Sequence, residues 1–266
     1  MERVGVRRAV TYAVTLATAA ALVTGCDTSG PEQAAPAPSA PAPAASAPLP
    51  ESPPPEPPPS NPAPTTPAGK LRTGSKGPEV LALQQSLTKL GYWNGRADGT
   101  FGSLTQQAVF ALQKAAGLTR DGVVGPKTRK ALDEGVRPRA RSDGGRVVEI
   151  DKKRQLLMLV DDGEVTQTFN TSTGSYERYE TTGGGTAVAA TPDGKFKVYR
   201  QIDGWRNAPL GMLWRPKYFN GGIAVHGATS VPPYPASHGC ARLSISAMNH
   251  LWGGDEIPLR TRVWVY

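Results

Sequence analysis

The stretch IAVHGATSVPPYPASHGCARL, residues 223–243, contains two of the chain's three histidines and one of its two cysteines. It begins with an apolar run of strand length that ends at His226. Further along, Gly239 allows a tight backbone turn beside Cys240 and can present backbone N–H groups to a developing oxyanion. A thiol becomes a useful nucleophile only as the thiolate, which a neighbouring imidazole promotes. We therefore predict a fold that places His226, at a strand end, where it exchanges a proton with Cys240.

Zinc binding is the alternative interpretation of the same residues. Cys240, His226 and His238 could supply three ligands to a zinc ion. No carboxylate or further cysteine completes a recognisable ligand spacing, so we favour a nucleophilic cysteine and expect neither a metal nor another cofactor.

The residues around this stretch indicate a mainly-β domain over residues 145–266. Apolar runs of strand length occupy residues 147–150 and 156–160, and Asp161-Asp162-Gly163 is a hairpin signal leading into residues 165–169. One short helix is expected after Ser244. Further strands are expected at residues 196–200, 223–226 and 262–266.

The block Ser237-His238-Gly239-Cys240, preceded by His226, resembles the signature of the YkuD-type L,D-transpeptidase family over roughly residues 145–266. The segment Thr191-Pro192-Asp193-Gly194-Lys195-Phe196 also resembles that family's Thr-Pro-x-Gly-x-Phe element. The resemblance implies that Cys240 is the nucleophile and His226 the general base and acid. It also implies supporting roles around the oxyanion for Ser237, His238 and Gly239, and a Gly227 carbonyl that orients His226.

Two departures from the family pattern leave the acceptor open. The interval from His226 to Ser237 is short, and Arg242 stands where many members carry asparagine. Arg242 is a candidate partner for a stem-peptide carboxylate, with a structural salt bridge as the alternative. Tyr218 and Trp214 are candidates for lining a substrate groove together with Trp205 and Phe219, with core packing as the alternative. We expect His250 to be a surface residue.

A small helical domain is predicted over residues 70–136. Apolar residues recur at helical spacing after Pro78 and again from Ser103 onward. The turn Asp98-Gly99-Thr100-Phe101-Gly102 recurs 23 residues later as Asp121-Gly122-Val123-Val124-Gly125, which predicts three helices joined by two similar turns.

This helical segment resembles the peptidoglycan-binding module often attached to wall enzymes. The match is carried by Leu90-Gly91-Tyr92, the two Asp-Gly turns, Gln113 and Gly117-Leu118. The resemblance implies wall targeting, and a helical spacer without a ligand is the alternative. Tyr92 and Trp93 could stack on sugars, although a structural role is the more conservative interpretation.

The N-terminus has the pattern of a secretory signal over residues 1–25, with arginines before an apolar run at residues 9–23. The sequence LVTGC at residues 22–26 resembles a bacterial lipobox, which implies diacylation of Cys26. Two acyl chains anchor a protein stably in a membrane. Residues 26–69 are so rich in proline and alanine that we expect a disordered, extended tether.

The formal net charge is +8, and its basic excess is concentrated in residues 70–144, which include a basic linker at 137–144. A polyanionic partner is therefore expected. Because the chain is expected to be exported and has no nucleic-acid-binding motif, we favour the cell wall over nucleic acid as this partner. The expected protein is a multidomain lipoprotein on the outer face of the cell membrane, and its oligomeric state is left open.

The family resemblance implies the reaction. We expect an L,D-transpeptidase that acts on peptidoglycan stem peptides through a Cys240 thioester, forms 3→3 crosslinks and is acylated by carbapenems. The alternatives are an L,D-carboxypeptidase that uses water as the acceptor and a wall-binding adaptor without activity.

Overall fold

The computed structural model describes residues 69–181 and 183–266, all of which belong to a single compact unit. The expected signal peptide, the lipidated Cys26 and the tether lie outside the described residues, Gly69 excepted. In the described part of the chain, no helix has the length and apolar character needed to cross a membrane.

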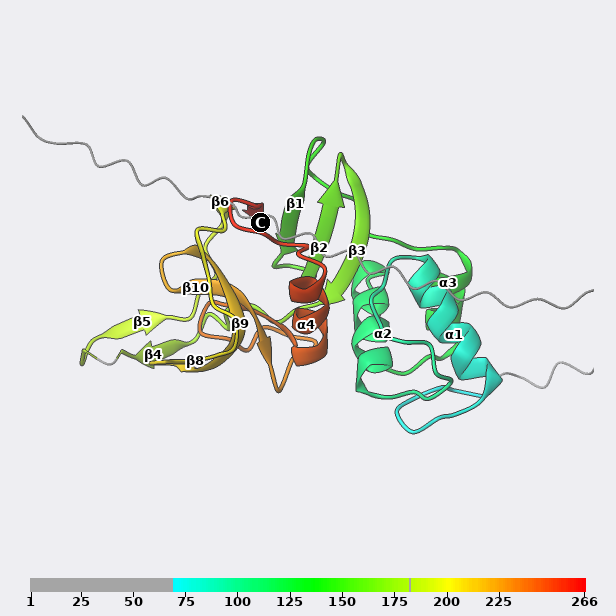
Figure 1. Cartoon of the computed structure of the whole chain (residues 1–266). Helices are drawn as coiled ribbons and strands as arrows, with labels where there is room; N and C mark the ends of the chain where they lie inside the picture. Colours follow the sequence, from blue (N-terminus) through cyan, green and yellow to red (C-terminus); the bar gives the residue numbers. More distant parts are fainter. Residues whose placement is uncertain (1–68, 182) are drawn as a thin grey trace, which may run out of the picture. The chain divides into compact units, whose positions relative to one another are not determined.

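The predicted three-helix segment is present (Figure 1). Its helices are α1 (Pro78–Lys89), α2 (Ser103–Ala115) and α3 (Pro126–Asp133). Proline occupies the first turn of α1 and of α3, where its missing N–H costs no helical hydrogen bond. Val80, Leu87 and Leu112 are completely buried between the helices, so the apolar spacing forms a small core.

A glutamine side chain holds each of the two repeated turns through the same pair of hydrogen bonds. The buried amide of Gln84 donates to Asp98 Oδ1 at 3.1 Å and accepts from the Gly99 N–H at 2.8 Å. Gln113 does the same for the second turn, donating to Asp121 Oδ1 at 2.7 Å and accepting from the Gly122 N–H at 3.0 Å. The internal repeat is therefore a structural repeat.

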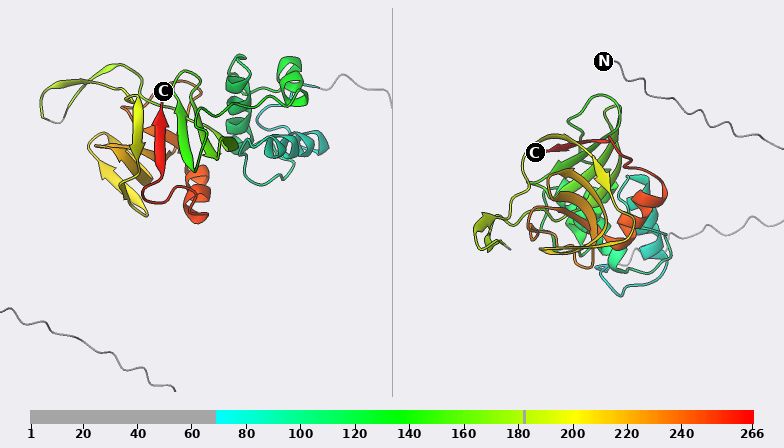
Figure 2. Two further views of the ribbon diagram at one scale, coloured as in Figure 1. Left: turned by 90° about the horizontal axis from the view of Figure 1, so that it is seen from above. Right: turned by 60° about the vertical axis from the view of Figure 1, so that its left-hand side comes forward.

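The β domain contains a five-stranded sheet in the order β3-β2-β1-β12-β6. The left view of Figure 2 shows β12 between β1 and β6. The β2–β3 turn was predicted correctly, because Asp162 and Gly163 both have positive φ (45° and 85°), as a two-residue hairpin turn requires. The strands are β1 (Val147–Asp151), β2 (Leu156–Asp161), β3 (Glu164–Asn170), β6 (Gly194–Lys197) and β12 (Arg262–Val265).

A second five-stranded sheet has the order β11-β10-β9-β7, with β8 paired to β9. The expected single strand at residues 196–200 is wrong: residues 194–197 join the first sheet and Arg200 joins the second, so the chain changes sheets between them. These strands are β7 (Arg200–Gln201), β8 (Trp205–Ala208), β9 (Gly211–Asn220), β10 (Ile223–Ala228) and β11 (Ala241–Ser244), and a separate pair is β4 (Arg178–Glu180) with β5 (Thr186–Val188).

The predicted helix after Ser244 is α4 (Ile245–Gly253). Ser244 caps it by accepting a hydrogen bond from the Ala247 N–H at 3.1 Å. Met248 and Leu251 of α4 pack into the main core with residues from both sheets, among them Val148, Val225 and Leu243. This core fixes the relative position of β10 and β11, the strands that carry the candidate site.

The helices contact the β domain directly, chiefly through α2 and β3. Tyr92 is completely buried and donates its hydroxyl to the Val136 carbonyl at 2.8 Å, and Trp93 packs against Phe169. The structural interpretation of both aromatics is therefore correct. The expectation that His250 is a surface residue is wrong, because its ring stacks on Trp93 and its Nε2 lies 2.8 Å from Gln167 Oε1.

Candidate active site

A cavity of about 1060 Å³ lies over the second sheet. The residues that line it come from β7 to β11, with the loops between them, and from the β4–β5 pair. The candidates that the sequence analysis selected and that line the cavity are Trp205, Tyr218, His226, Ser237, His238, Cys240 and Arg242.

Strand register brings the reactive side chains to one face of the sheet. Strands β10 and β11 run parallel, and His226 is the register partner of Arg242. Cys240 lies two residues before Arg242, immediately before β11 begins, so its side chain points to the same face. The structure thus brings together His226, Cys240 and Arg242, as predicted for the first two.

The His226 ring is oriented by the backbone carbonyl of the next residue. Its Nδ1 lies 2.9 Å from the Gly227 carbonyl oxygen. A carbonyl can only accept, so Nδ1 carries the proton and Nε2 is left as the basic nitrogen. Burial lowers the pKa of His226 to about 4, with the Gly227 hydrogen bond opposing this shift and the Arg242 charge adding to it. His226 is therefore a neutral base at neutral pH.

Cys240 is a free, half-buried cysteine. Its Sγ faces the Gly222 carbonyl oxygen at 3.9 Å. Burial raises the pKa of the thiol, and a backbone hydrogen bond from Ala224 and the charge of Arg242 offset part of that rise. The resting site therefore holds a neutral thiol and a neutral imidazole in one cavity.

The turn before Cys240 requires a glycine. Gly239 has φ of +137°, and a Cβ there would lie 2.9 Å from the Ala190 carbonyl oxygen. Ser237 Oγ accepts from the Gly239 N–H at 3.0 Å and donates to the Cys240 carbonyl at 2.6 Å. Because Ser237 takes the Gly239 N–H, the contribution of Gly239 is the shape of the turn rather than a free oxyanion donor.

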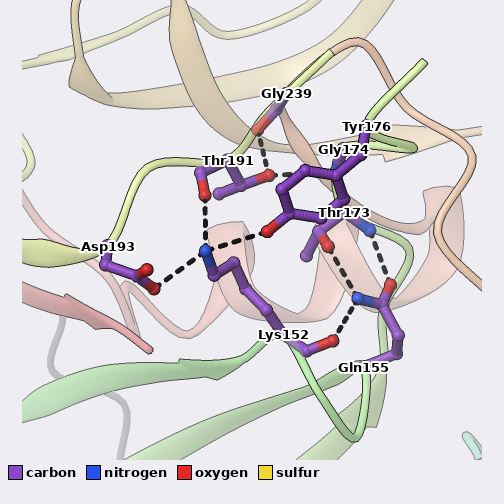
Figure 3. A network of polar contacts seen from close by, with 8 residues as sticks. All are labelled: Lys152, Gln155, Thr173, Gly174, Tyr176, Thr191, Asp193 and Gly239. Carbon is purple, nitrogen blue, oxygen red and sulfur yellow. Dashed lines mark hydrogen bonds and ion pairs between the residues drawn. The ribbon is translucent and has the colours of Figure 1, made fainter. Parts of the chain in front are cut away.

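Thr191, which belongs to the Thr-Pro-x-Gly-x-Phe segment, braces this turn (Figure 3). Its buried Oγ1 donates to the Gly239 carbonyl at 2.6 Å and accepts from the Gly174 N–H at 3.0 Å. The position of Gly239, and with it that of Cys240, is thereby tied to a segment some fifty residues earlier.

Lys152 in turn holds Thr191. Its Nζ donates to the Thr191 carbonyl at 3.0 Å and to the Tyr176 hydroxyl at 3.0 Å, and pairs with Asp193 Oδ1 at 2.8 Å (Figure 3). Sequence reasoning missed Lys152 as a support, because no local pattern marks it. The network continues through Gln155 and Thr173, which exchange two hydrogen bonds.

Replacing Thr191 by valine should slow acylation of Cys240 while leaving the chain folded. Valine keeps the shape of threonine but leaves the Gly239 carbonyl and the Gly174 N–H without their partner, at a cost of about 1–3 kcal/mol each. We expect the second-order rate constant for carbapenem acylation, followed by intact-protein mass, to fall by about tenfold or more.

Thr166→Val is the matched control for this prediction. It also removes one hydroxyl that donates to a backbone carbonyl, that of Leu159 at 3.2 Å, but on the β2–β3 hairpin. Equal acylation rates for Thr191→Val and the control would show that the brace is not needed.

Arg242 lines the cavity. None of the ion pairs within residues 69–181 and 183–266 involves it, so the structural salt bridge that was its alternative interpretation is absent from the described chain. Its backbone is fixed by hydrogen bonds to Ser172 and Thr171, which hold the strand end in place.

Trp214 is not part of the cavity, which corrects its selection as a substrate-binding candidate. Its indole packs against Gly227 and the main core and donates to Asn249 Oδ1 at 2.6 Å. The cause is a bulge in β9: Lys217 pairs with Val225 and Trp214 with Gly227, so β9 has one residue more than β10. Arg215, with φ of 47°, occupies the bulge, which turns Trp214 to the face opposite Tyr218.

Trp205 and Tyr218 do line the cavity, whereas Phe219 is buried in the core. His238 also lines the cavity, where its ring meets the edge of Tyr179 at 4.9 Å between centroids. Among the residues that the structure describes, no group of three His, Cys, Asp or Glu side chains is arranged to hold a metal ion.

Two family models match the chain. A putative peptidoglycan binding domain matches residues 76–132, and an L,D-transpeptidase catalytic domain (YkuD) matches residues 145–265. These matches fall within the expected domains at 70–136 and 145–266.

A mainly-β fold with a cysteine and a histidine in one cavity thus coincides with the match to a transpeptidase domain. The crystal structure of the L,D-transpeptidase (residues 123-326) from Xylanimonas cellulosilytica is 55% identical, with a TM-score of 0.73, and the match covers 78% of this chain and 100% of that one. The chain belongs to the L,D-transpeptidase family.

Curated relatives match a short part of the chain. The chain is 47% identical over 64 residues to N-acetylmuramoyl-L-alanine amidase CwlL of Bacillus licheniformis, covering 23% of this chain and 18% of that protein. It is 41% identical over 56 residues to N-acetylmuramoyl-L-alanine amidase CwlM of Mycobacterium tuberculosis, covering 21% of this chain and 14% of that protein. The chain thus spans less than a fifth of the length of these curated relatives.

Proposed function

We propose that this L,D-transpeptidase domain crosslinks peptidoglycan through an acyl-enzyme on Cys240. The sulfur of Cys240 attacks the carbonyl of the third stem residue while His226 Nε2 takes its proton. The C–N bond to the terminal D-alanine then breaks, and His226 returns the proton to the leaving amine. The amine of a second stem attacks the thioester, which forms the 3→3 crosslink and restores the thiol.

One observation carries the proposal: His226 and Cys240 share a cavity in which Nδ1 of His226 is already committed to Gly227. This leaves Nε2 as the one ring nitrogen able to accept the thiol proton. The neutral pair also suits a reaction in which charge develops only during attack, since both pKa shifts disfavour a resting ion pair.

Arg242 is proposed to bind a carboxylate of the stem peptide. Its guanidinium faces the same cavity and lacks an ion-pair partner in the described part of the chain. Arg200 Cζ lies 5.2 Å from the ring centroid of Tyr218. Tyr218 is proposed to form part of the cavity wall that binds the stem peptide.

Membrane attachment through diacylated Cys26 is proposed on the sequence alone. The signal-like residues 1–25 and the LVTGC motif support it. Radiolabelled palmitate should enter the wild-type protein, and Cys26→Ser should lose both the label and its place in the membrane fraction; a Cys26→Ser protein that keeps both would disprove the anchor.

The test of the function is to incubate the purified protein with disaccharide-tetrapeptide and identify the products by mass. Crosslinked dimers with release of one D-alanine per crosslink are expected. Disaccharide-tripeptide without dimers would instead assign an L,D-carboxypeptidase. Unchanged substrate, together with a protein that gains no carbapenem mass, would assign a wall-binding adaptor.

A further inference from the structure

A cationic groove is formed by strands of the β3-β2-β1-β12-β6 sheet, by the segment before β1 and by residues at and after the end of α2. It consists of two adjoining hollows, of about 600 and 640 Å³, that share Arg141. In the segment before β1, Ala140 packs with the aromatic side chains of Trp264 and Tyr266. The C-terminus of the chain lies there too, between β1 and β6 (Figure 1).

The groove is strongly and asymmetrically charged. Two carboxylates, Asp143 and Asp151, line it, and a third, Glu149, is buried beneath, where it accepts from the backbone of Arg141 and from the Tyr266 hydroxyl. Against these stand eight cationic side chains, and the buried amine of Lys114 lies at the floor. The eight are Arg120, Arg139, Arg141, Lys153, Arg154, Lys195, Lys197 and Arg262.

Most of these cations form no ion pair with another described residue. Within residues 69–181 and 183–266, Arg154 is the one cation of the groove that forms an ion pair, with Asp151 at 3.8 Å. Lys114 lies at the floor, where its Nζ donates to the neutral carbonyls of Gln155 and Thr171 at 2.8 and 3.0 Å. Burial and the nearby Arg120 lower the pKa of Lys114 to about 6, so Lys114 is mostly neutral at pH 7 and an anion in the groove would favour its protonated form.

The groove is separate from the catalytic cavity. The two share no lining residue, and the groove belongs to the first sheet whereas the cavity lies over the second. A ligand in the groove therefore leaves His226 and Cys240 accessible.

We propose that this groove binds a linear wall polymer that carries repeated phosphodiester groups. Cations distributed along two consecutive hollows match a repeating negative charge better than the single carboxylate of one stem peptide. Five of the eight cations are arginines, whose planar guanidinium groups fit phosphate oxygens in pairs.

The aromatic side chains of the groove argue for a polyol phosphate rather than a nucleic acid. Lys195 Nζ lies 4.3 Å from the ring centroid of Trp264, and Arg141 Cζ lies 3.6 Å from that of Tyr266. Each ring thus has a cation over one face, which a base would have to displace in order to stack there.

The test measures binding of fluorescent poly(glycerol phosphate) to the purified full chain by anisotropy at several salt concentrations. We expect saturable binding that weakens steeply with salt. The triple substitution Arg139→Gln, Lys153→Gln and Lys197→Gln removes exposed cations from both hollows and should weaken binding by about tenfold or more, with a shallower salt dependence.

The matched control removes the same charge elsewhere: Lys89→Gln, Lys127→Gln and Lys130→Gln lie on exposed positions of the helical segment and should change affinity by less than about twofold. Equal weakening by both triples, or no binding by the wild-type chain, would overturn the proposal. If poly-glutamate bound equally well, the proposed preference for phosphodiester groups would be wrong. If oligo-deoxythymidylate bound equally well, the proposed preference for a polyol phosphate would be wrong.

Discussion

Replacing Cys240 by alanine is expected to abolish crosslink formation. The rate of dimer formation from disaccharide-tetrapeptide should fall by roughly 10⁴-fold or more, to the background of the assay, because the atom that forms the acyl bond is gone. The carbapenem adduct should disappear with it. Cys240 is half-buried beside the cavity, so the smaller side chain should leave the fold intact.

The matched control for this loss is the other cysteine of the chain. Cys26→Ala also removes a cysteine, but from the N-terminal region, and the proposal assigns Cys26 to membrane attachment and to no step of the chemistry. Cys26→Ala should therefore keep the full rate of dimer formation in solution. A Cys240→Ala protein that still forms dimers would refute the thioester mechanism.

Replacing His226 by glutamine is expected to lower the acylation rate by about 10²- to 10⁴-fold at neutral pH. Glutamine is close to histidine in size but cannot accept the thiol proton, so attack must wait for the rare thiolate. The measurement is the second-order rate constant for acylation by a carbapenem, followed by intact-protein mass. The same constant is then measured as a function of pH.

The wild-type and His226→Gln proteins should differ most in how the acylation rate depends on pH. The wild-type rate should fall as the pH drops through about 4, because His226 then becomes protonated and stops accepting. The His226→Gln rate should instead rise about tenfold per pH unit, since it follows the thiolate fraction of a thiol whose pKa lies above its ordinary 9.0.

His250→Gln is the matched control, because it changes the histidine that stacks on Trp93, remote from the cavity lining. It should leave both the rate and the pH profile unchanged. If His226→Gln kept the wild-type profile, another group would have to be the base.

Local sequence patterns were enough to predict much of this molecule. The two Asp-Gly turns, the Asp162-Gly163 hairpin and the short helix after Ser244 each depend on a few adjacent residues, and all four are present. The juxtaposition of His226 and Cys240 was also predictable, since a strand end and a glycine turn lie only fourteen residues apart.

The parts that were not predictable depend on contacts distant in sequence. Trp214 was misplaced because the bulge at Arg215 inverts the side-chain alternation of β9, and nothing in the composition of that strand indicates a bulge. Lys152 gave no signal because its partners, Thr191 and Tyr176, come from other segments.

The contacts between the helical segment and the β domain could likewise not be predicted from the sequence. Lys114 reads as an ordinary charged residue near the end of a helix, yet it is buried and hydrogen-bonded to Asn170 and the carbonyl of Gln155 in the β domain. Gln107 of the same helix donates to the Val231 carbonyl at 3.2 Å, in the loop that leads to the Ser237 turn. The helices therefore support the segment that carries the candidate site.

The most direct test of the account is to trap the acyl-enzyme and locate it. The protein is mixed with disaccharide-tetrapeptide, quenched in acid and digested, and the modified peptide is sequenced by mass spectrometry. The account predicts an adduct of the donor lacking its terminal D-alanine on Cys240. An adduct on any other residue, or dimer formation with Cys240 unmodified throughout, would contradict it.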